Sequence, residues 1–364
     1  MRIEQQTLKE ALSDVGRFIP SRPTLPVLSN VKMKVWQNQL TMVATNLEAF
    51  CTKTVECQTD TDEVWETTVP FSLFNDYVNS LSGTIEIVYQ EASIKIVCGK
   101  TEITIRTIDA SEYPLIPEIP DVEPIVFQSQ DLVKQLSSVV FAAATDENRP
   151  ILTGVYFRSD GEKLVTAAAD GYRMAVYTAN LQGDKFEMVI PAKFIASLIA
   201  IVGNDTVTMN AYHNNSQAIF AMENVTLVAQ LIEGQFPDFT QILPKSKTVT
   251  IIVDQKDLLH KVKQIGIIAR KSSNILTISY QKDKVEITAQ TADIGAAISE
   301  IEAAVDGEYF ETASNYIFLV QALSTMSGKI VIEQGGSARP IKLYPENNDV
   351  NCHVIMPMHI HKDA

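Results

Sequence analysis

Residues 149–174 read RPILTGVYFRSDGEKLVTAAADGYRM, and the organisation of the whole chain can be worked out from this stretch. Two apolar runs, 151–157 and 163–169, flank an Asp-Gly pair, which between apolar strands is a strong hairpin signal. A second Asp-Gly pair follows and places Arg173 among apolar neighbours. The stretch therefore predicts a β-hairpin whose end carries a cation. Such an end is either a surface that meets a ligand or a hairpin with an incidental arginine.

Segments of one design recur along the chain. Amphipathic helices are expected over 5–19, 130–144 and 255–271, and their leucines Leu8, Leu132 and Leu258 are 124 and 126 residues apart. The apolar residues of each helix recur at helical spacing on one face. A second helix is expected in each copy over 71–82, 191–202 and 312–328, with Phe74, Phe194 and Tyr316 as equivalent positions.

Strand-like runs lie between and after the helices. Equivalent runs occur at 40–45, 164–169 and 285–290, and later hairpins begin near residues 84, 206 and 329. The sequence therefore predicts an α+β protein of three tandem domains, each with two helices and antiparallel sheets, over 1–125, 126–246 and 247–364. If each junction turns the chain by a constant angle, such an array can close into a ring.

Composition places the chain among ordinary folded proteins. Its 364 residues suggest two or three domains, and 46% of them are hydrophobic. No run has the roughly 18 apolar residues of a membrane span, and the N-terminus has no apolar signal core. We therefore expect a cytoplasmic protein without a membrane partner. The four cysteines show no metal-type spacing, and a site formed by Cys352, His353, His359 and His361 is disfavoured.

Charge is distributed unevenly. A net charge of −14 would argue against nucleic acid if it were spread over the whole surface. The expected helix 255–271, however, opposes a single acid, Asp257, with Lys256, Lys261, Lys263, Arg270 and Lys271. Helices that face phosphate and strands that repel it would give this pattern. Strands and loops that are simply acidic would give it equally well.

Signatures of catalysis are missing. The chain has no phosphate-binding loop, no dinucleotide fingerprint, no nucleophile elbow and no zinc-protease motif. This favours a binding scaffold that performs no catalysis and needs no cofactor or metal. The rival hypothesis is an enzyme, such as a hydrolase, that uses Asp146, Glu147 and Asp170 at the domain junctions.

Five segments in order, on a threefold repeat, resemble the bacterial β sliding clamp family, the processivity subunits of replicative DNA polymerase. They are RPTLPVLSN (22–30), ENRPILTGV (147–155), DGYRMA (170–175), EGQFPDF (233–239) and MPM (356–358). The resemblance implies a head-to-tail homodimeric ring of six domains, with helices lining a hole for duplex DNA. It implies as partners non-specific double-stranded DNA, the replicative DNA polymerase, the clamp loader and other proteins with a clamp-binding motif.

The resemblance also implies a slot for a partner peptide between the second and third domains. Its residues here would be Leu152, Ala169, Gly171, Tyr172, Arg173, Met174, Pro237, Ile242, Tyr316, Val354, Ile355, Met356, Pro357 and Met358. Such side chains form an adaptable apolar surface. Plain core packing is the alternative for each residue taken alone, above all for Leu152 and Val354. Ala169 stands where relatives often have threonine, Gln241 where arginine can occur, and residues 359–364 extend past the usual end.

Two further sets of residues are implied. DNA contacts are expected from Arg22 and Arg149 by resemblance, and by charge from Lys193, Lys256, Lys261 and Lys263. Ring closure would pack Ile267 and Ile268 against Ile103 and Ile105 of a second copy, beside a polar rim. The alternative to a clamp is a monomeric adaptor that keeps the peptide slot and has lost ring closure.

Overall fold

The structure is a computed structural model that describes residues 1–59, 64–146, 148–202, 208–213, 216–244, 246–271, 273–291, 293–347 and 350–358. The described residues contain six α-helices. They are α1 (Gln5–Gly16), α2 (Phe71–Ser80), α3 (Ser129–Ser137), α4 (Ala192–Val202), α5 (Gln255–Ala269) and α6 (Tyr316–Ser324). A strand ends immediately before each helix, so that strand and helix are consecutive in every case.

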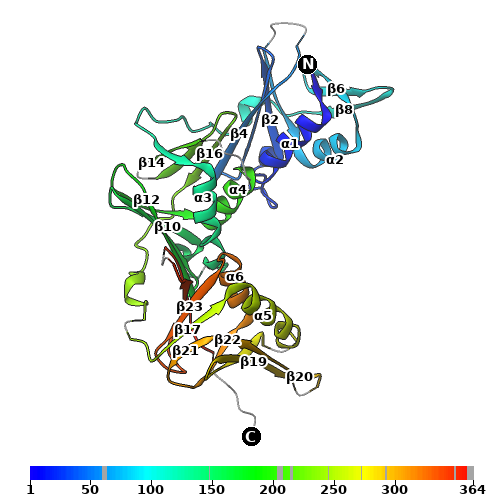
Figure 1. The fold of residues 1–364 in the computed structure, drawn as a ribbon. Coiled ribbons are helices and arrows are strands. Elements are labelled where there is room, and N and C mark those ends of the chain that lie inside the picture. Colours follow the sequence, from blue (N-terminus) through cyan, green and yellow to red (C-terminus); the bar gives the residue numbers. More distant parts are fainter. Residues whose placement is uncertain are drawn as a thin grey trace. The chain divides into compact units, whose positions relative to one another are not determined.

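The order of elements repeats three times, as the sequence predicts (Figure 1). Repeat 1 has strands β1 (Arg2–Glu4), β2 (Asn30–Trp36), β3 (Gln39–Thr45), β4 (Ala49–Glu56), β5 (Trp65–Pro70), β6 (Thr84–Gln90), β7 (Ser93–Cys98) and β8 (Thr101–Arg106). Repeat 2 has β9 (Ile125–Gln128), β10 (Gly154–Ser159), β11 (Lys163–Ala169), β12 (Arg173–Asn180), β13 (Phe186–Pro191), β14 (Thr208–His213), β15 (Gln217–Ala221) and β16 (Val225–Gln230).

Repeat 3 has the same order with one short strand added, β21. Its strands are β17 (Val249–Asp254), β18 (Ile275–Gln281), β19 (Lys284–Thr291), β20 (Gly295–Glu302), β21 (Ala304–Gly307), β22 (Glu311–Asn315), β23 (Lys329–Gln334), β24 (Ile341–Pro345) and β25 (Asn351–Ile355). Apart from β21, each repeat is therefore strand, helix, four strands, helix and three strands. The hairpin predicted around Asp160-Gly161 is the β10–β11 pair.

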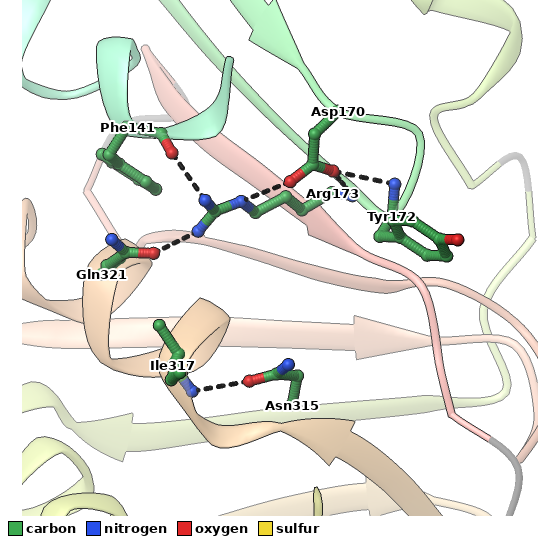
Figure 2. A network of polar contacts seen from close by, with 7 residues as sticks. All are labelled: Phe141, Asp170, Tyr172, Arg173, Asn315, Ile317 and Gln321. Atoms are coloured by element: carbon green, nitrogen blue, oxygen red, sulfur yellow. Dashed lines mark hydrogen bonds and ion pairs between the residues drawn. The ribbon is translucent and has the colours of Figure 1, made fainter. Parts of the chain in front are cut away.

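Two predicted helices differ in extent. The helix expected over 312–328 begins only at Tyr316, because residues 312–315 belong to β22 and pair with β18. Asn315 caps this helix by accepting the Ile317 N–H at 2.9 Å (Figure 2). Counted from the helix starts, Tyr316 is thus equivalent to Phe71 and Ala192, and the proposed equivalence with Phe74 and Phe194 is wrong. The helix expected over 130–144 ends at Ser137, and a 3-10 turn follows at Val140–Ala142.

The strands form four sheets in two compact units. Unit 1 (1–130 and 200–231) holds the sheets β1-β6-β7-β8 and β5-β2-β3-β4-β16-β15-β14-β9. Unit 2 (131–199 and 232–364) holds β13-β10-β11-β12-β25-β24-β23-β17-β21 and β20-β19-β18-β22. The larger sheet of each unit combines strands of two repeats, joined by β4–β16 in unit 1 and by β12–β25 in unit 2. The units therefore do not coincide with the sequence repeats.

The helices cover the cores with the faces that the periodicity predicts. The equivalent leucines Leu8, Leu132 and Leu258 are all buried. Within unit 1, α1 packs on α2 and on β3 and β4; within unit 2, α5 packs on α6 and β19. Burial of these apolar faces is the main source of stability. In the described part of the chain, no helix has both the length and the apolar character needed to cross a membrane.

Candidate functional site

The turn between β11 and β12 is held by the side chain of Asp170 (Figure 2). Its Oδ1 accepts the backbone N–H groups of Tyr172 at 2.8 Å and of Arg173 at 2.9 Å. Gly171 between them has φ +91°, a left-handed conformation that glycine adopts without steric cost. The turn is therefore well defined, and it presents Tyr172 with 63% of its surface exposed.

The guanidinium of Arg173 is held from three sides. Its Nε donates to Asp170 Oδ2 at 3.0 Å, Nη2 to the carbonyl of Phe141 at 2.6 Å, and Nη1 to Gln321 Oε1 (Figure 2). Its Cζ lies 4.4 Å from the ring centroid of Phe318 and 5.4 Å from that of Phe141, within cation–π range. Burial lowers the pKa of Arg173, and the Asp170 charge acts in the opposite direction. The side chain is 11% exposed, so it faces the protein more than the solvent.

The last strand brings the end of the chain to this turn. β25 pairs antiparallel with β12, with Arg173 opposite Ile355 and Met174 opposite Val354. Beyond the strand, the Met356 N–H donates to the carbonyl of Tyr172 at 2.8 Å. The predicted residues of the DGYRM and VIM segments are thus neighbours in the fold, although about 180 positions separate them in sequence.

An apolar cluster lies beneath the turn. Four residues predicted for the slot belong to it and are buried: Leu152, Ala169, Met174 and Val354. Sequence reasoning missed three aromatic members, Tyr156, Phe236 and Phe239. The rings of Tyr156 and Phe236 stack at 4.9 Å between centroids. The EGQFPDF motif contained the signal, because Phe236 and Phe239 are its two apolar aromatic residues; the prediction took only Pro237 from this motif, and Pro237 is exposed.

The other predicted slot residues differ in exposure. Tyr172, Ile242 and Met356 are exposed large apolar side chains, and Gly171 and Pro237 are also exposed. Tyr316, Pro357 and Met358 are half-buried, whereas Ile355 is buried in the core of repeat 3. Met358 pairs with Ala313 of β22 through a backbone hydrogen bond of 2.8 Å. The extension 359–364 lies outside the described residues.

His353 is a buried polar residue behind the Arg173 network. Its ring stacks on Phe141 at 5.7 Å, and its Nε2 lies 2.9 Å from Asn351 Oδ1 and 3.1 Å from Thr325 Oγ1. Burial, reinforced by the charge of Arg173, lowers the pKa of His353 to about 3. The ring is therefore neutral at neutral pH and serves as a structural hydrogen-bonding group.

Five of the six residues predicted to contact DNA are exposed. Arg22, Arg149 and Lys193 are exposed. A methyl group on Gly171 would lie 3.9 Å from Arg149 Nη1, so Arg149 is beside the Asp170 turn. On α5 and its C-cap, helical spacing and exposure define a basic face of Lys256, His260, Lys263 and Arg270, with the apolar Ile267 on the same side. Lys261 is half-buried and points to a different side of the helix.

The predicted interface residues are not equally available. Ile267 is 54% exposed on α5, whereas Ile268 packs against the core of its own repeat. On β8, Ile103 is half-buried and Ile105 is only 2% exposed. The two side chains lie two residues apart and therefore share one face of β8, on which Ile105 is the more fully covered within its own copy.

The carboxylates of the rival enzyme hypothesis have structural partners. Asp170 holds the turn and Arg173, and Asp146 Oδ1 accepts the N–H of Asn148 at 3.1 Å. Glu147 lies outside the described residues. Among the residues that are described, no group of three or more His, Cys, Asp or Glu side chains is arranged to hold a metal ion.

Comparisons with known proteins cover nearly the whole chain. Residues 1–117 match the N-terminal domain of the DNA polymerase III beta subunit, residues 127–238 its central domain and residues 240–359 its C-terminal domain. The beta sliding clamp of Staphylococcus epidermidis is 25% identical over 95% of this chain and 96% of its own length. That of Bacillus subtilis is 26% identical over 98% of both. The crystal structure of the Bacillus subtilis DNA polymerase sliding clamp superposes with a TM-score of 0.92 over 99% of both chains.

Proposed function

This chain belongs to the DNA polymerase III beta subunit family and is a non-catalytic processivity factor of the sliding-clamp type; we propose that two copies close head to tail around duplex DNA. In this ring the chain tethers the replicative polymerase and other proteins that carry a clamp-binding motif, and a clamp loader places it on DNA. We assign this role to the cytoplasm.

Strand pairing at the repeat junctions carries the proposal. In unit 1, β4 pairs with β16, the last strand of the next repeat, and in unit 2, β12 pairs in the same way with β25. The equivalent of β4 and β12 in repeat 3 is β20, and the equivalent of β16 and β25 in repeat 1 is β8. Each lies at the end of its described sheet. The same junction would therefore pair β20 with β8 of a second copy, and two such junctions close a ring.

Apolar side chains near these edges support the pairing. Ile298 on β20 is 66% exposed and Ile267 on α5 is 54% exposed, and Ile103 on β8 is half-buried. Association would cover these side chains and remove two open strand edges from solvent. Ile105 and Ile268 would lie beneath the interface and would not contact the second copy directly, because each already packs within its own copy.

DNA contact in this proposal is electrostatic. The basic face of α5 supplies Lys256 and Lys263, with Lys261 contributing less because it is half-buried and off that face. Arg22, Arg149 and Lys193 are exposed and would add contacts to phosphate. Contacts to phosphate carry no sequence information, which suits a protein that must slide. Encirclement retains DNA even when each contact is weak.

Partner peptides would bind on the surface formed by the Asp170 turn and the end of the chain. Its exposed apolar members are Tyr172, Met356 and Ile242, over the buried cluster of Leu152, Ala169, Met174 and Val354. The remaining members of the proposed site are Gly171, Arg173, Pro237, Tyr316, Ile355, Pro357 and Met358. The flexible Met side chain and the exposed aromatic ring, lying over this buried cluster, can adapt to several related peptides.

We propose domain boundaries near residues 125 and 246 for this ring. The three repeats of element order are compatible with these limits, and so are the matched segments that end at 117 and 238. The match of the C-terminal domain begins at 240, slightly before our second boundary.

A topological experiment tests the proposed function. The protein is loaded on a closed circular plasmid by the clamp loader of the same organism, isolated with it, and the plasmid is then cut once. We expect the protein to stay on the circle and to leave after linearisation, since a ring slides off a free end. Equal retention on circular and linear DNA would contradict encirclement, and no retention on either would favour a peptide-binding adaptor.

A further inference from the structure

We propose that Gln321 and Arg173 form a positioning pair for the partner site, in which Gln321 of α6 fixes the arginine and the arginine fixes the turn that presents Tyr172. The inference rests on the proposed function, and it changes the role of Arg173 from a contact for partners to a support behind the contact surface. It also adds Gln321, which the sequence does not single out.

The first argument is that Arg173 is already occupied. Three acceptors, on Asp170, Phe141 and Gln321, take hydrogen bonds from its three nitrogens. The ring of Phe318 covers the guanidinium at 4.4 Å. With 11% of the side chain exposed, little of this cation is open to a partner carboxylate.

The second argument is an internal comparison with the equivalent turn in repeat 1. Asn46 Oδ1 accepts the N–H groups of Glu48 at 3.1 Å and Ala49 at 2.8 Å, as Asp170 does for Tyr172 and Arg173. The Gln230 N–H donates to the carbonyl of Glu48 at 2.7 Å, as that of Met356 does to Tyr172. This turn therefore forms the same structure with alanine in the place of arginine. The arginine network is not needed to fold such a junction.

The third argument concerns which segments the network joins. Phe141 belongs to the 3-10 turn after α3, Asp170 to the β11–β12 turn, and Phe318 and Gln321 to α6. Phe318 and Gln321 are three positions apart and thus share one face of that helix. All these segments lie in unit 2. The network therefore couples α6 to the backbone on which Tyr172 and Met356 meet.

The consequence is a definite role for the Gln321 oxygen. Without this acceptor, a guanidinium N–H in a mostly buried position loses its partner, which is unfavourable for a charged donor. Arg173 must then shift or draw in water, and the Asp170 turn that its Nε stabilises becomes looser. A looser turn pays more ordering entropy when a partner binds, so affinity falls without loss of any direct contact.

The test compares four variants of the full-length protein with the wild type. Gln321→Ala removes the acceptor, and Gln321→Glu keeps an acceptor oxygen in place. Tyr172→Ala removes a proposed direct contact, and Gln264→Ala is a matched control at an exposed position of α5. The probe is a fluorescently labelled peptide with the clamp-binding segment of the same organism's replicative polymerase. Its Kd is measured by anisotropy, and hydrogen exchange of the Tyr172 and Arg173 amides is measured without peptide.

We expect Gln321→Ala to weaken peptide binding about tenfold and to speed exchange of these two amides. Gln321→Glu should restore both, and Gln264→Ala should match the wild type. If Tyr172→Ala weakens binding but Gln321→Ala changes neither affinity nor exchange, the positioning role is wrong and the partner site stands. If Gln321→Ala and Gln321→Glu are equally impaired, the glutamine acts through packing and the inference also fails. If Tyr172→Ala leaves binding intact, the proposed partner site itself is wrong.

Discussion

Gly266 of α5 lies directly against the ring of Tyr316, the first residue of α6: a methyl group on this glycine would be 2.5 Å from Cδ2 of the tyrosine. Repeat 1 contains the same relationship, in which a methyl group on Gly16 of α1 would be 2.4 Å from Cζ of Phe71, the first residue of α2. In both helix pairs, an aromatic ring at the start of the second helix thus packs where the first has no side chain.

This contact predicts that Gly266→Ala destabilises the protein. In an exposed helix, alanine would be more favourable than glycine by about 1 kcal/mol. Here the ring must move, and overpacking of this kind costs about 1–3 kcal/mol. We therefore expect a net loss of stability in denaturant unfolding. The double variant Gly266→Ala/Tyr316→Ala should lose less than the two single variants together, whereas additive losses would mean that the residues do not clash.

Buried His353 predicts a specific loss of stability in acid. Its pKa in the folded protein, about 3, lies below its ordinary value of 6.5. The unfolded chain therefore binds a proton that the folded chain excludes, so this contribution to stability is full above pH 6.5 and declines as the pH falls toward 3. Between pH 7 and pH 5 the loss should be about 2 kcal/mol.

The measurement is urea unfolding of wild type and His353→Gln at pH 7 and pH 5. The variant has lower stability at pH 7 because a buried residue is changed, but its difference between the two pH values should be smaller by about 2 kcal/mol. His260→Gln, at an exposed position on α5, is the control and should keep the pH dependence of the wild type. An unchanged pH dependence in His353→Gln would show that this ring does not couple stability to pH.

The sequence predicts the repeat well because apolar periodicity and helix spacing are local signals. Leu8, Leu132 and Leu258 are buried as equivalent positions. The main error concerns where the second helix of repeat 3 begins. Residues 312–315 (TASN) resemble the first turn of that helix, and only their pairing with β18 shows that they form a strand. β-Structure depends on a distant partner, and no local pattern reveals it.

Only those site residues that belong to recognisable sequence segments could be predicted. Tyr172 and Met174 follow from the DGYRMA motif and Val354 from the family resemblance, and the structure brings the three together. Gln321 and Phe141 could not be found, because a single hydrogen bond between remote segments leaves no spacing in the sequence. The burial of Ile105 within its own copy could not be predicted either, because it depends on which face of β8 is covered.

The basic face of α5 predicts a charge-dependent effect on DNA binding. Lys263→Ala should weaken binding of the dimer to duplex DNA and lower the slope of log affinity against log salt by about 1, the value for one phosphate contact. Lys261→Ala should have a smaller effect, because this residue lies off the face. Lys282→Ala, in the exposed turn between β18 and β19, is the matched control. Equal effects of all three variants would contradict an assignment to this face.

Ring closure predicts the effect of one charge at the interface. Ile267→Asp should convert the dimer to monomers, because it places a carboxylate where an apolar side chain would be covered. Ile119→Asp is a matched control, at 47% exposure against 54% for Ile267, in the segment between repeats 1 and 2. The midpoint temperature of thermal unfolding of both variants should stay close to that of the wild type. This result would show that Ile267→Asp loses assembly and keeps its fold.

The most direct test of the account is the solution mass of the wild type by light scattering over a dilution series. We expect about twice the chain mass of 40.3 kDa, persisting to low concentration, and a single chain mass for Ile267→Asp. A wild type that is monomeric at every concentration would contradict the closed ring, and with it the encirclement of DNA.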